Sequence, residues 1–242
     1  MNYAASVGDF FKSPKWMSNL LLGGLCILIP ILGPMVVFGW LVTGFWSRTD
    51  EDFATFPAFE FAQFDKYLER GLWPFLVTLA TGFIIVPFIW LLMFGMMAMS
   101  VFSFGDEQRA GGCLGAIVML CLILVAGAGF LSVIVLLVPL KLRATMTQDF
   151  AKAFDFRFVK RFLALVWAET MLSVMFTVLV SALLISFGAL FLCVGAYLST
   201  VVSYFAGTHL HKQLYALYLS RGGEPVPLSL NLIVVPPALP TT

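Results

Sequence analysis

One acidic side chain, Glu169, stands in a long stretch of sequence that is otherwise apolar. An ionisable group inside a membrane-spanning helix is costly, and it faces the interior of the helix bundle by default. Polar residues recur every four positions from it, so one stripe of a helix would carry Glu169, Ser173, Thr177 and Ser181. A carboxyl group in this setting can act as a general acid or base, couple to an ion, or only pack and orient its helix.

The next apolar segment carries a matching ridge of small residues, namely Gly195, Ser199, Ser203 and Gly207. Small residues spaced by four let transmembrane backbones approach closely, so we predict that ridge and stripe face each other across a turn near Gly188. Reflection through this turn places Glu169 level with Thr208 and His209, and we expect it to hydrogen-bond one of them. The alternatives are that the carboxylate reaches the lipid headgroups or turns towards a cation.

Two histidines, His209 and His211, follow at the end of the same segment. Residues two apart on a helix point about 200° away from each other, so this pair cannot share a metal ion. Either histidine alone has the chemistry to bind a haem or a chlorophyll, but we expect interfacial side chains beside Lys212 and predict no cofactor.

Other signatures of chemistry are missing from the sequence. It holds no GxSxG, HExxH, P-loop or dinucleotide-binding motif. The cluster of Asp50, Glu51 and Asp52 is typical of a solvated loop, and the four cysteines stand singly within apolar runs. We therefore predict no catalytic residue and no metal site, and we expect that the protein is not an enzyme.

The composition indicates whether the chain lies in water or in a membrane. Of its 242 residues, 61% are hydrophobic and 11% are charged, and the mean hydropathy is +0.99. Soluble proteins carry about 25% charged residues, so this chain belongs in a bilayer. Its net charge of +1 excludes the basic face of a nucleic-acid-binding protein.

Gaps between charged residues locate the membrane spans. A helix needs about 20 apolar residues to cross the hydrocarbon core, and four segments meet this condition. We predict spans at 72–104, 112–140, 163–186 and 189–210. Pro87 is expected to kink the first of them.

An earlier apolar run, 17–46, is interrupted by Pro30, Gly33 and Pro34. Each half is too short to cross the bilayer, so the run either crosses once with a kink or folds back as a re-entrant hairpin. With a hairpin, 13 of the 14 Lys and Arg residues lie on one side of the membrane, and with a single crossing 11 do. Because basic loops stay in the cytoplasm, we predict the hairpin, with both termini cytoplasmic.

Two polar stretches, 59–70 and 148–162, repeat phenylalanine at helical spacing beside charged residues. We predict two amphipathic helices at the membrane interface, with Phe inward and the cations towards the headgroups. The fold expected is thus an all-α polytopic membrane protein, with residues 1–221 as one integral-membrane domain. The Pro-rich apolar tail, 222–242, is predicted to dock in extended form on a partner subunit or on the chain's own cytoplasmic helices.

Three segments carry a resemblance to a known family. They are SPKWMSNLLLGGLCILIPILGPMVVFGW, TFPAFEFAQFDKYLERGLWPF and QDFAKAFDFRFVKRF. Taken in this order, they resemble a prokaryotic membrane family catalogued as domain of unknown function 4013, over roughly residues 10–220. The resemblance supports a multi-pass architecture in a bacterial or archaeal cytoplasmic membrane, and it implies no activity.

These features favour a non-catalytic subunit or scaffold of a larger membrane assembly. Its partners would be membrane lipids and other membrane subunits or a second copy, and not nucleic acid. One alternative is a transporter or channel of small solutes or ions, built around the broken helix at Pro30 and Pro34. Another is a membrane enzyme acting on lipids, with Glu169 and His209 as its acid–base pair.

Overall fold

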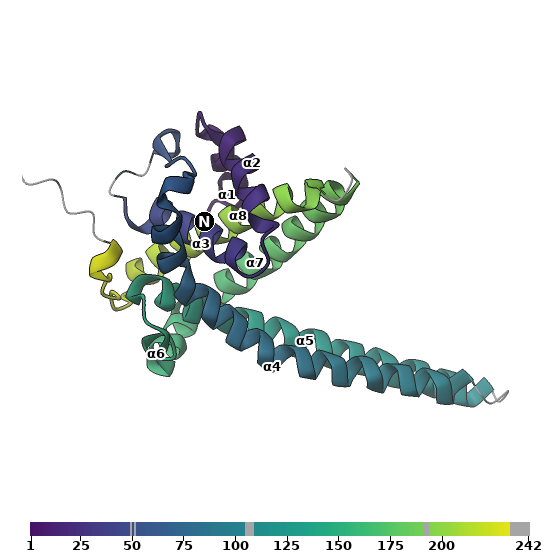
Figure 1. Ribbon diagram of the computed structural model, residues 1–242. Helices are drawn as coiled ribbons and strands as arrows, with labels where there is room; N and C mark the ends of the chain where they lie inside the picture. The colour runs from purple at the N-terminus through teal and green to yellow at the C-terminus, as the bar shows by residue number, and fades with distance from the viewer. Residues whose placement is uncertain (49, 51, 105–108, 191–193, 233–242) are drawn as a thin grey trace, which may run out of the picture. The chain divides into compact units, whose positions relative to one another are not determined.

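A computed structural model describes residues 1–48, 50, 52–104, 109–190 and 194–232. Every regular element among these residues is helical, as predicted (Figure 1). The chain divides into two compact units, Thr78–Leu137 and the remainder. The boundaries of these units fall inside two long helices, and the described part of the tail belongs to the larger unit.

The helices follow one another along the chain, and the segment between α3 and α4 carries two 3₁₀ turns. The α-helices are α1 Tyr3–Gly8, α2 Trp16–Ile27, α3 Leu32–Trp46, α4 Phe64–Phe104, α5 Arg109–Thr147, α6 Phe150–Ala153, α7 Phe156–Ala189 and α8 Val194–Ser220. Short 3₁₀ turns are η1 Asp9–Lys12, η2 Phe53–Thr55, η3 Phe61–Gln63 and η4 Leu230–Leu232.

Within the described residues, three helical segments are long and apolar enough to cross a membrane. They are Phe61–Pro87, Ile117–Thr147 and Phe156–Ala189. The protein is therefore a membrane protein. The fourth predicted span, 189–210, includes positions 191–193, which lie outside the described residues, and α8 is not among the three.

The predicted break in the first apolar run separates α2 from α3. Ile31 adopts a positive φ of 67°, and α3 begins at the next residue, with Pro34 in its first turn, where a proline is tolerated. The two helices then pack on each other. A β-carbon at Gly33 would lie 2.1 Å from the carbonyl oxygen of Cys26, so glycine is required for this tight helical hairpin.

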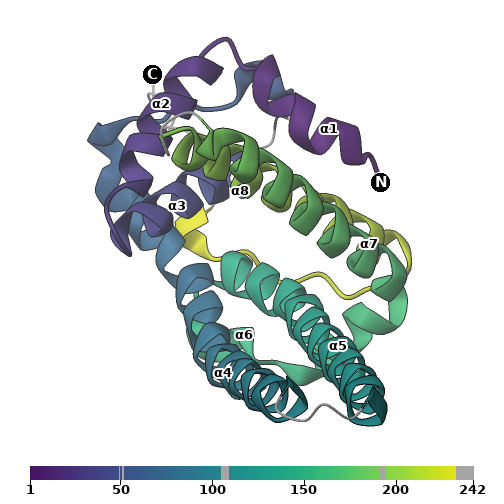
Figure 2. The ribbon, with the colours of Figure 1, turned by 90° about the vertical axis from the view of Figure 1, so that its right-hand side faces the viewer.

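Helix α3 forms the centre of the larger unit. Of its 15 residues 11 are buried, on all sides of the helix, which is the pattern of a core helix. It lies against α2 and α8 (Figure 2). Two large side chains of α3, Trp40 and Phe45, form one core cluster with Phe56, Phe59, Tyr67 and Phe205 from other segments.

Two glycines set the separation of α3 and α4. A β-carbon on Gly39 would lie 1.7 Å from the carbonyl oxygen of Tyr67, and one on Gly71 would lie 1.8 Å from that of Met35. The contact is reciprocal, because each glycine stands four residues after the residue whose carbonyl meets the other glycine. Such close approaches allow Cα–H···O contacts between helices. Only glycine fits at either position.

The two predicted amphipathic segments are not separate helices of that length. Segment 59–70 divides into η3 and the first turns of α4, which continues unbroken into the predicted span. Segment 148–162 divides into α6 and the start of α7, because Asp155 accepts hydrogen bonds from the backbone N–H groups of Arg157 and Phe158. This N-cap begins α7 seven residues before the predicted start at 163.

Helix α7 bends inside its length. Val166 has φ −136° and ψ 28°, outside the helical region. Its carbonyl accepts a hydrogen bond of 2.7 Å from the hydroxyl of Thr170. A side chain that bonds to the backbone in this way is an identifiable cause of bending.

The contact between α3 and α4 can be tested with a single methyl group. Gly39→Ala is expected to lower the free energy of unfolding by about 2 kcal/mol or more, because the methyl forces two backbones apart. Thermal unfolding of the purified protein in detergent, followed by tryptophan fluorescence, measures the change.

Gly82→Ala is the matched control, since a β-carbon there meets no atom within 4 Å. It should leave stability unchanged or raise it by up to about 1 kcal/mol through helix propensity. Equal stability of the two variants would contradict the close contact.

Candidate functional site

Glu169 forms an ion pair with Arg221, the first residue after α8. The Nη2 atom of Arg221 lies 2.5 Å from Oε1 of Glu169, and Nη1 lies 3.1 Å from Oε2. Nη1 also donates to the carbonyl of Leu165. The hydrogen bonds that Arg221 donates to Glu169 raise the pKa of Arg221 above its usual value. The ion pair thus joins the C-terminal end of α8 to α7.

The predicted hydrogen bond of Glu169 to Thr208 or His209 was wrong. Helix α8 continues to Ser220, so Arg221 reaches back to the carboxylate, which is the alternative in which Glu169 turns towards a cation. The hydroxyl of Thr208 bonds instead to the carbonyl of Tyr204. Glu169 and His209 therefore have different partners and do not form an acid–base pair.

The small-residue ridge of α8 meets α7 at Thr177 of the polar stripe and at Gly188 near the turn. A β-carbon on Gly207 would lie 3.6 Å from the methyl of Thr177, and one on Gly188 would lie 2.4 Å from the carbonyl of Gly195 and 2.5 Å from the hydroxyl of Ser199. The hydroxyls of Ser173 and Ser203 each bond to the carbonyl four residues earlier. Ser181 is half-buried. These groups pack the helices together.

His209 is buried among aromatic rings of the larger unit. Its ring lies 4.8 Å from that of Phe53 and 5.5 Å from that of Phe45, measured between centroids. Its Nδ1 atom is 3.9 Å from Oδ2 of Asp9, which also forms a 2.7 Å ion pair with Lys12. A hollow of about 250 Å³ lies beside it, lined by Phe53, His209, Lys212, Gln213 and Ala216.

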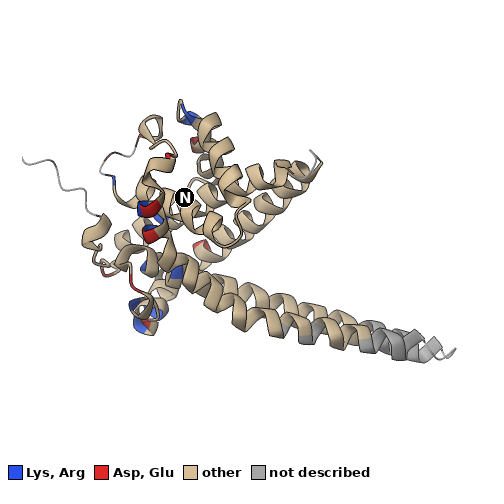
Figure 3. Cartoon of the chain, viewed as in Figure 1, with Lys and Arg blue, Asp and Glu red and all other residues tan. Residues whose placement is uncertain are grey.

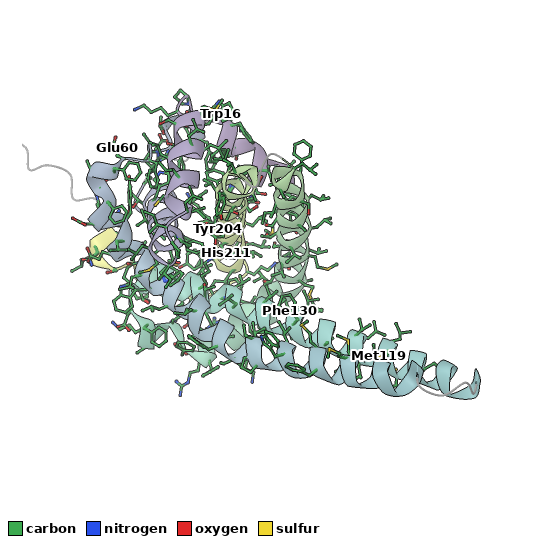
Figure 4. All side chains as sticks on the ribbon, turned by 45° about the vertical axis from the view of Figure 1, so that its right-hand side comes forward. Trp16, Glu60, Met119, Phe130, Tyr204 and His211 are labelled. Carbon is green, nitrogen blue, oxygen red and sulfur yellow. The ribbon has the colours of Figure 1, made fainter. Side chains whose placement is uncertain are left out.

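His211, labelled in Figure 4, lies on a different side of α8 from His209. It lines a small cavity together with Lys141. The cavity measures about 10 Å³, which is room for about one water molecule. The ammonium of Lys141 stands 3.8 Å from the centre of the Phe38 ring, a cation–π contact. The two histidines share no ligand position, and no group of three His, Cys, Asp or Glu residues able to hold a metal occurs within the described residues.

The transporter hypothesis depends on the helix break around Pro30, and the side chains at this break are apolar. Leu28, Ile29, Ile31 and Leu32 surround Pro30 and are each at least 43% exposed in the isolated chain. Met17, Leu21 and Leu25 extend the same character along α2. The hairpin tip has the chemistry of a lipid-facing surface.

Sequence reasoning missed a polar node centred on Arg70. This side chain is 5% exposed and donates to the hydroxyl of Thr43 at 2.9 Å and to the carbonyl of Asn231. The carbonyl of Arg70 accepts from Gln148, and the amide of Asn231 donates to Glu69 at 2.9 Å. One guanidinium thus joins α3, α4 and the tail. In the sequence Arg70 is one of several charged residues in a segment predicted to lie at the membrane interface, and nothing there indicates this role.

The tail docks on helices of its own chain as far as it is described. The N–H of Val226 donates to the hydroxyl of Tyr215, and the N–H of Ser229 donates to the carbonyl of Met146, both at 2.8 Å. Leu232 is buried, and it ends the 3₁₀ turn η4, where the predicted extended form is interrupted. Residues 233–242 lie outside the described residues. For these residues, docking on a partner subunit stays a prediction.

Arg70→Met should release this tail. A hydrogen bond to a charged group contributes about 1.5–3 kcal/mol, so amide hydrogen exchange at Val226 and Ser229 should accelerate at least about tenfold. Exchange measured by mass spectrometry, with Lys66→Met as an exposed control one turn away, tests this. Unchanged protection in Arg70→Met would show that the node does not hold the tail.

Comparison with known proteins places the chain in a family. The family described as Protein of unknown function (DUF4013) matches residues 22–194, about seven tenths of the chain. No curated protein and no solved structure matches it. The matched part begins inside α2 and contains α3, α4, α5 and α7. The chain is a membrane protein that belongs to the DUF4013 family of unknown function.

Proposed function

We propose that the protein is a non-catalytic integral-membrane subunit or scaffold, which binds a transmembrane helix of another membrane protein through its α4–α5 hairpin. The observation that carries this proposal is an apolar cleft in the smaller unit, Thr78–Leu137. The cleft has a volume of about 570 Å³. Its lining residues are Ile84, Ile85, Ile89, Met93, Met96, Ala126, Gly127, Gly129, Phe130 and Val133.

The composition of the smaller unit suits a helix-binding surface. Residues 78–104 and 110–137 include no Asp, Glu, Lys or Arg in the sequence. Figure 3 shows the described part of this unit without acidic or basic residues. Phe130 and Met119 project from α5 (Figure 4). Large apolar side chains are exposed on both helices, including Phe83, Ile84, Met97 and Leu124, each above 60%. Protein interiors are close-packed, so we expect another molecule to fill a cleft of this size.

The small residues of the cleft favour a helix as that occupant. A β-carbon at Gly127 meets no atom within 4 Å, so its missing side chain serves no contact inside this chain. Small residues at such positions let a second transmembrane backbone approach closely. Met93 and Met96, which line the cleft from α4, have flexible side chains that can adapt to the surface of a bound helix.

The same proposal includes four crossings and a re-entrant hairpin, with both termini in the cytoplasm. Helix α8 has 27 residues, about 40 Å of helix, and it packs along α7. Helices α2 and α3, with 12 and 15 residues, reach about 18 and 22 Å, less than the hydrocarbon core. Gly23 and Gly24 seat α2 against Val201 and Leu198 of α8, which supports insertion of the hairpin beside that helix.

Cysteine labelling tests the hairpin. Lys15→Cys and Glu60→Cys, each in a background without the four native cysteines, place exposed thiols before and after it. Both should react with a membrane-impermeant maleimide from the cytoplasmic face of oriented vesicles. Labelling from opposite faces would show a single crossing.

A larger side chain in the cleft tests the proposed assembly. Gly127→Leu should lower the fraction of protein in the native complex at least fivefold, because the added side chain fills space reserved for the partner helix. Native gel electrophoresis of gently solubilised membranes, followed by quantification of free and assembled protein, measures that fraction.

Gly95→Leu is the control, because a β-carbon there also meets nothing within 4 Å but the residue does not line the cleft. It should assemble like the natural protein, and both variants should unfold at the natural temperature. Full assembly of Gly127→Leu, or a natural protein that is monomeric in its own membrane, would refute the proposal.

A further inference from the structure

The start of α7 carries more positive charge than its own acids neutralise. Around α6 and this end of α7 stand five cations, Arg143, Lys152, Arg157, Lys160 and Arg161, and three acids, Asp149, Asp155 and Glu224. Each acid is paired: Arg143 with Asp155 at 2.8 Å, Lys152 with Asp149 at 3.2 Å, and Arg161 with Glu224. The backbone and side-chain hydrogen bonds from Lys152 also hold the pKa of Asp149 below its usual value.

Arg157 and Lys160 are the cations left over from this pairing. Within the described residues neither forms an ion pair, and both are exposed. They stand three apart on α7, so their side chains share one face of the helix. Figure 3 shows basic residues gathered at α6 and the adjoining start of α7. Two unpaired cations side by side form an anion-binding surface.

Apolar residues around these cations indicate which anion fits. Phe156, directly before Arg157, is 73% exposed, and Trp167 is 57% exposed. Exposure of an aromatic ring beside two cations is unfavourable in water, but this combination suits the boundary of a bilayer. A soluble phosphate would leave Phe156 uncovered, whereas a lipid covers it.

The depth of the residues agrees with a lipid headgroup. From Trp167 to Ala189 the helix extends about 33 Å, which matches a hydrocarbon core of about 30 Å with Trp167 at its boundary. Lys160 precedes Trp167 by seven residues, about 10 Å of helix, and so stands at the level of the headgroups. An Arg guanidinium binds phosphate oxygens in a bidentate manner, and a Lys ammonium adds a point charge.

We propose that Arg157 and Lys160 bind the phosphate of an anionic phospholipid, with Phe156 against the upper part of its acyl chains. A zwitterionic lipid carries its own cation beside the phosphate, so a lipid with net negative charge gains more from this surface. The site does not depend on the partner helix proposed for α4 and α5. It lies in the other unit of the chain.

Lipid binding to the full chain in detergent tests the site. Native mass spectrometry during titration with phosphatidylglycerol or phosphatidylcholine gives the dissociation constant of the first bound lipid. Each basic residue near a membrane contributes about 1 kcal/mol, so Arg157→Gln with Lys160→Gln should weaken phosphatidylglycerol binding about thirtyfold. Phosphatidylcholine binding should change less than threefold.

Lys12→Gln with Lys152→Gln is the matched control, because it removes the same charge from cations already paired with Asp9 and Asp149. It should retain phosphatidylglycerol binding within about threefold. The exchange Arg157→Lys with Lys160→Arg keeps both charges and should also retain binding. Equal loss in the control pair would show a general charge effect and overturn the site.

Inorganic phosphate distinguishes the lipid from a soluble anion. At 10-fold molar excess over phosphatidylglycerol it should leave lipid binding unchanged, since it supplies no apolar contact to Phe156. Displacement of the lipid by inorganic phosphate, lost again in Arg157→Gln with Lys160→Gln, would overturn the proposal in favour of a soluble phosphate site.

Discussion

The larger unit depends on the close approach of α3 and α4, where two glycines each admit a backbone carbonyl of the opposite helix. Because the helices touch through their backbones, α3 is buried on every side and the aromatic rings around it have fixed positions. His209 is held by rings of this cluster, and Arg70 reaches Thr43 on α3 from the turn of α4 beside Gly71. A separation larger by one methyl group would alter all of these contacts.

Charge has two different uses in this chain. Arg70, Arg143, Arg161 and Arg221 each bind backbone carbonyls, and three of them also pair with acids. Arg70, Arg161 and Arg221 thereby join segments far apart in the sequence, whereas Arg143 joins the end of α5 to the nearby α6 and the start of α7. Arg157 and Lys160 make no such bond within the described residues and face outward. Arginine suits the first use because its planar fork offers several donors in fixed directions. A count of basic residues per loop does not distinguish the two uses.

Hydropathy and the gaps between charges were sufficient to predict an all-helical membrane protein and a helix break at Pro30. These features follow from local composition, which is visible along the chain. The start of α7 at Phe156 was missed because it depends on the geometry of the Asp155 cap, one residue among several polar ones. The partner of Glu169 was missed because the reflection from Gly188 considered only residues at equal depth, whereas Arg221 has a long side chain. The Arg70 node joins residues up to 162 positions apart, which no local pattern reveals.

The bend at Val166 separates the first ten residues of α7 from the rest of that helix. With the hydroxyl of Thr170 bonded to the Val166 carbonyl, the two segments join at an angle without leaving that carbonyl unpaired. A helix articulated at this point can change the tilt of its apolar part while its basic end stays level with the membrane surface. Hydrophobic mismatch is relieved in membranes by such changes of tilt. The bend therefore gives the apolar part of α7 an axis different from that of its first ten residues, which is the freedom that an adjustment of tilt requires.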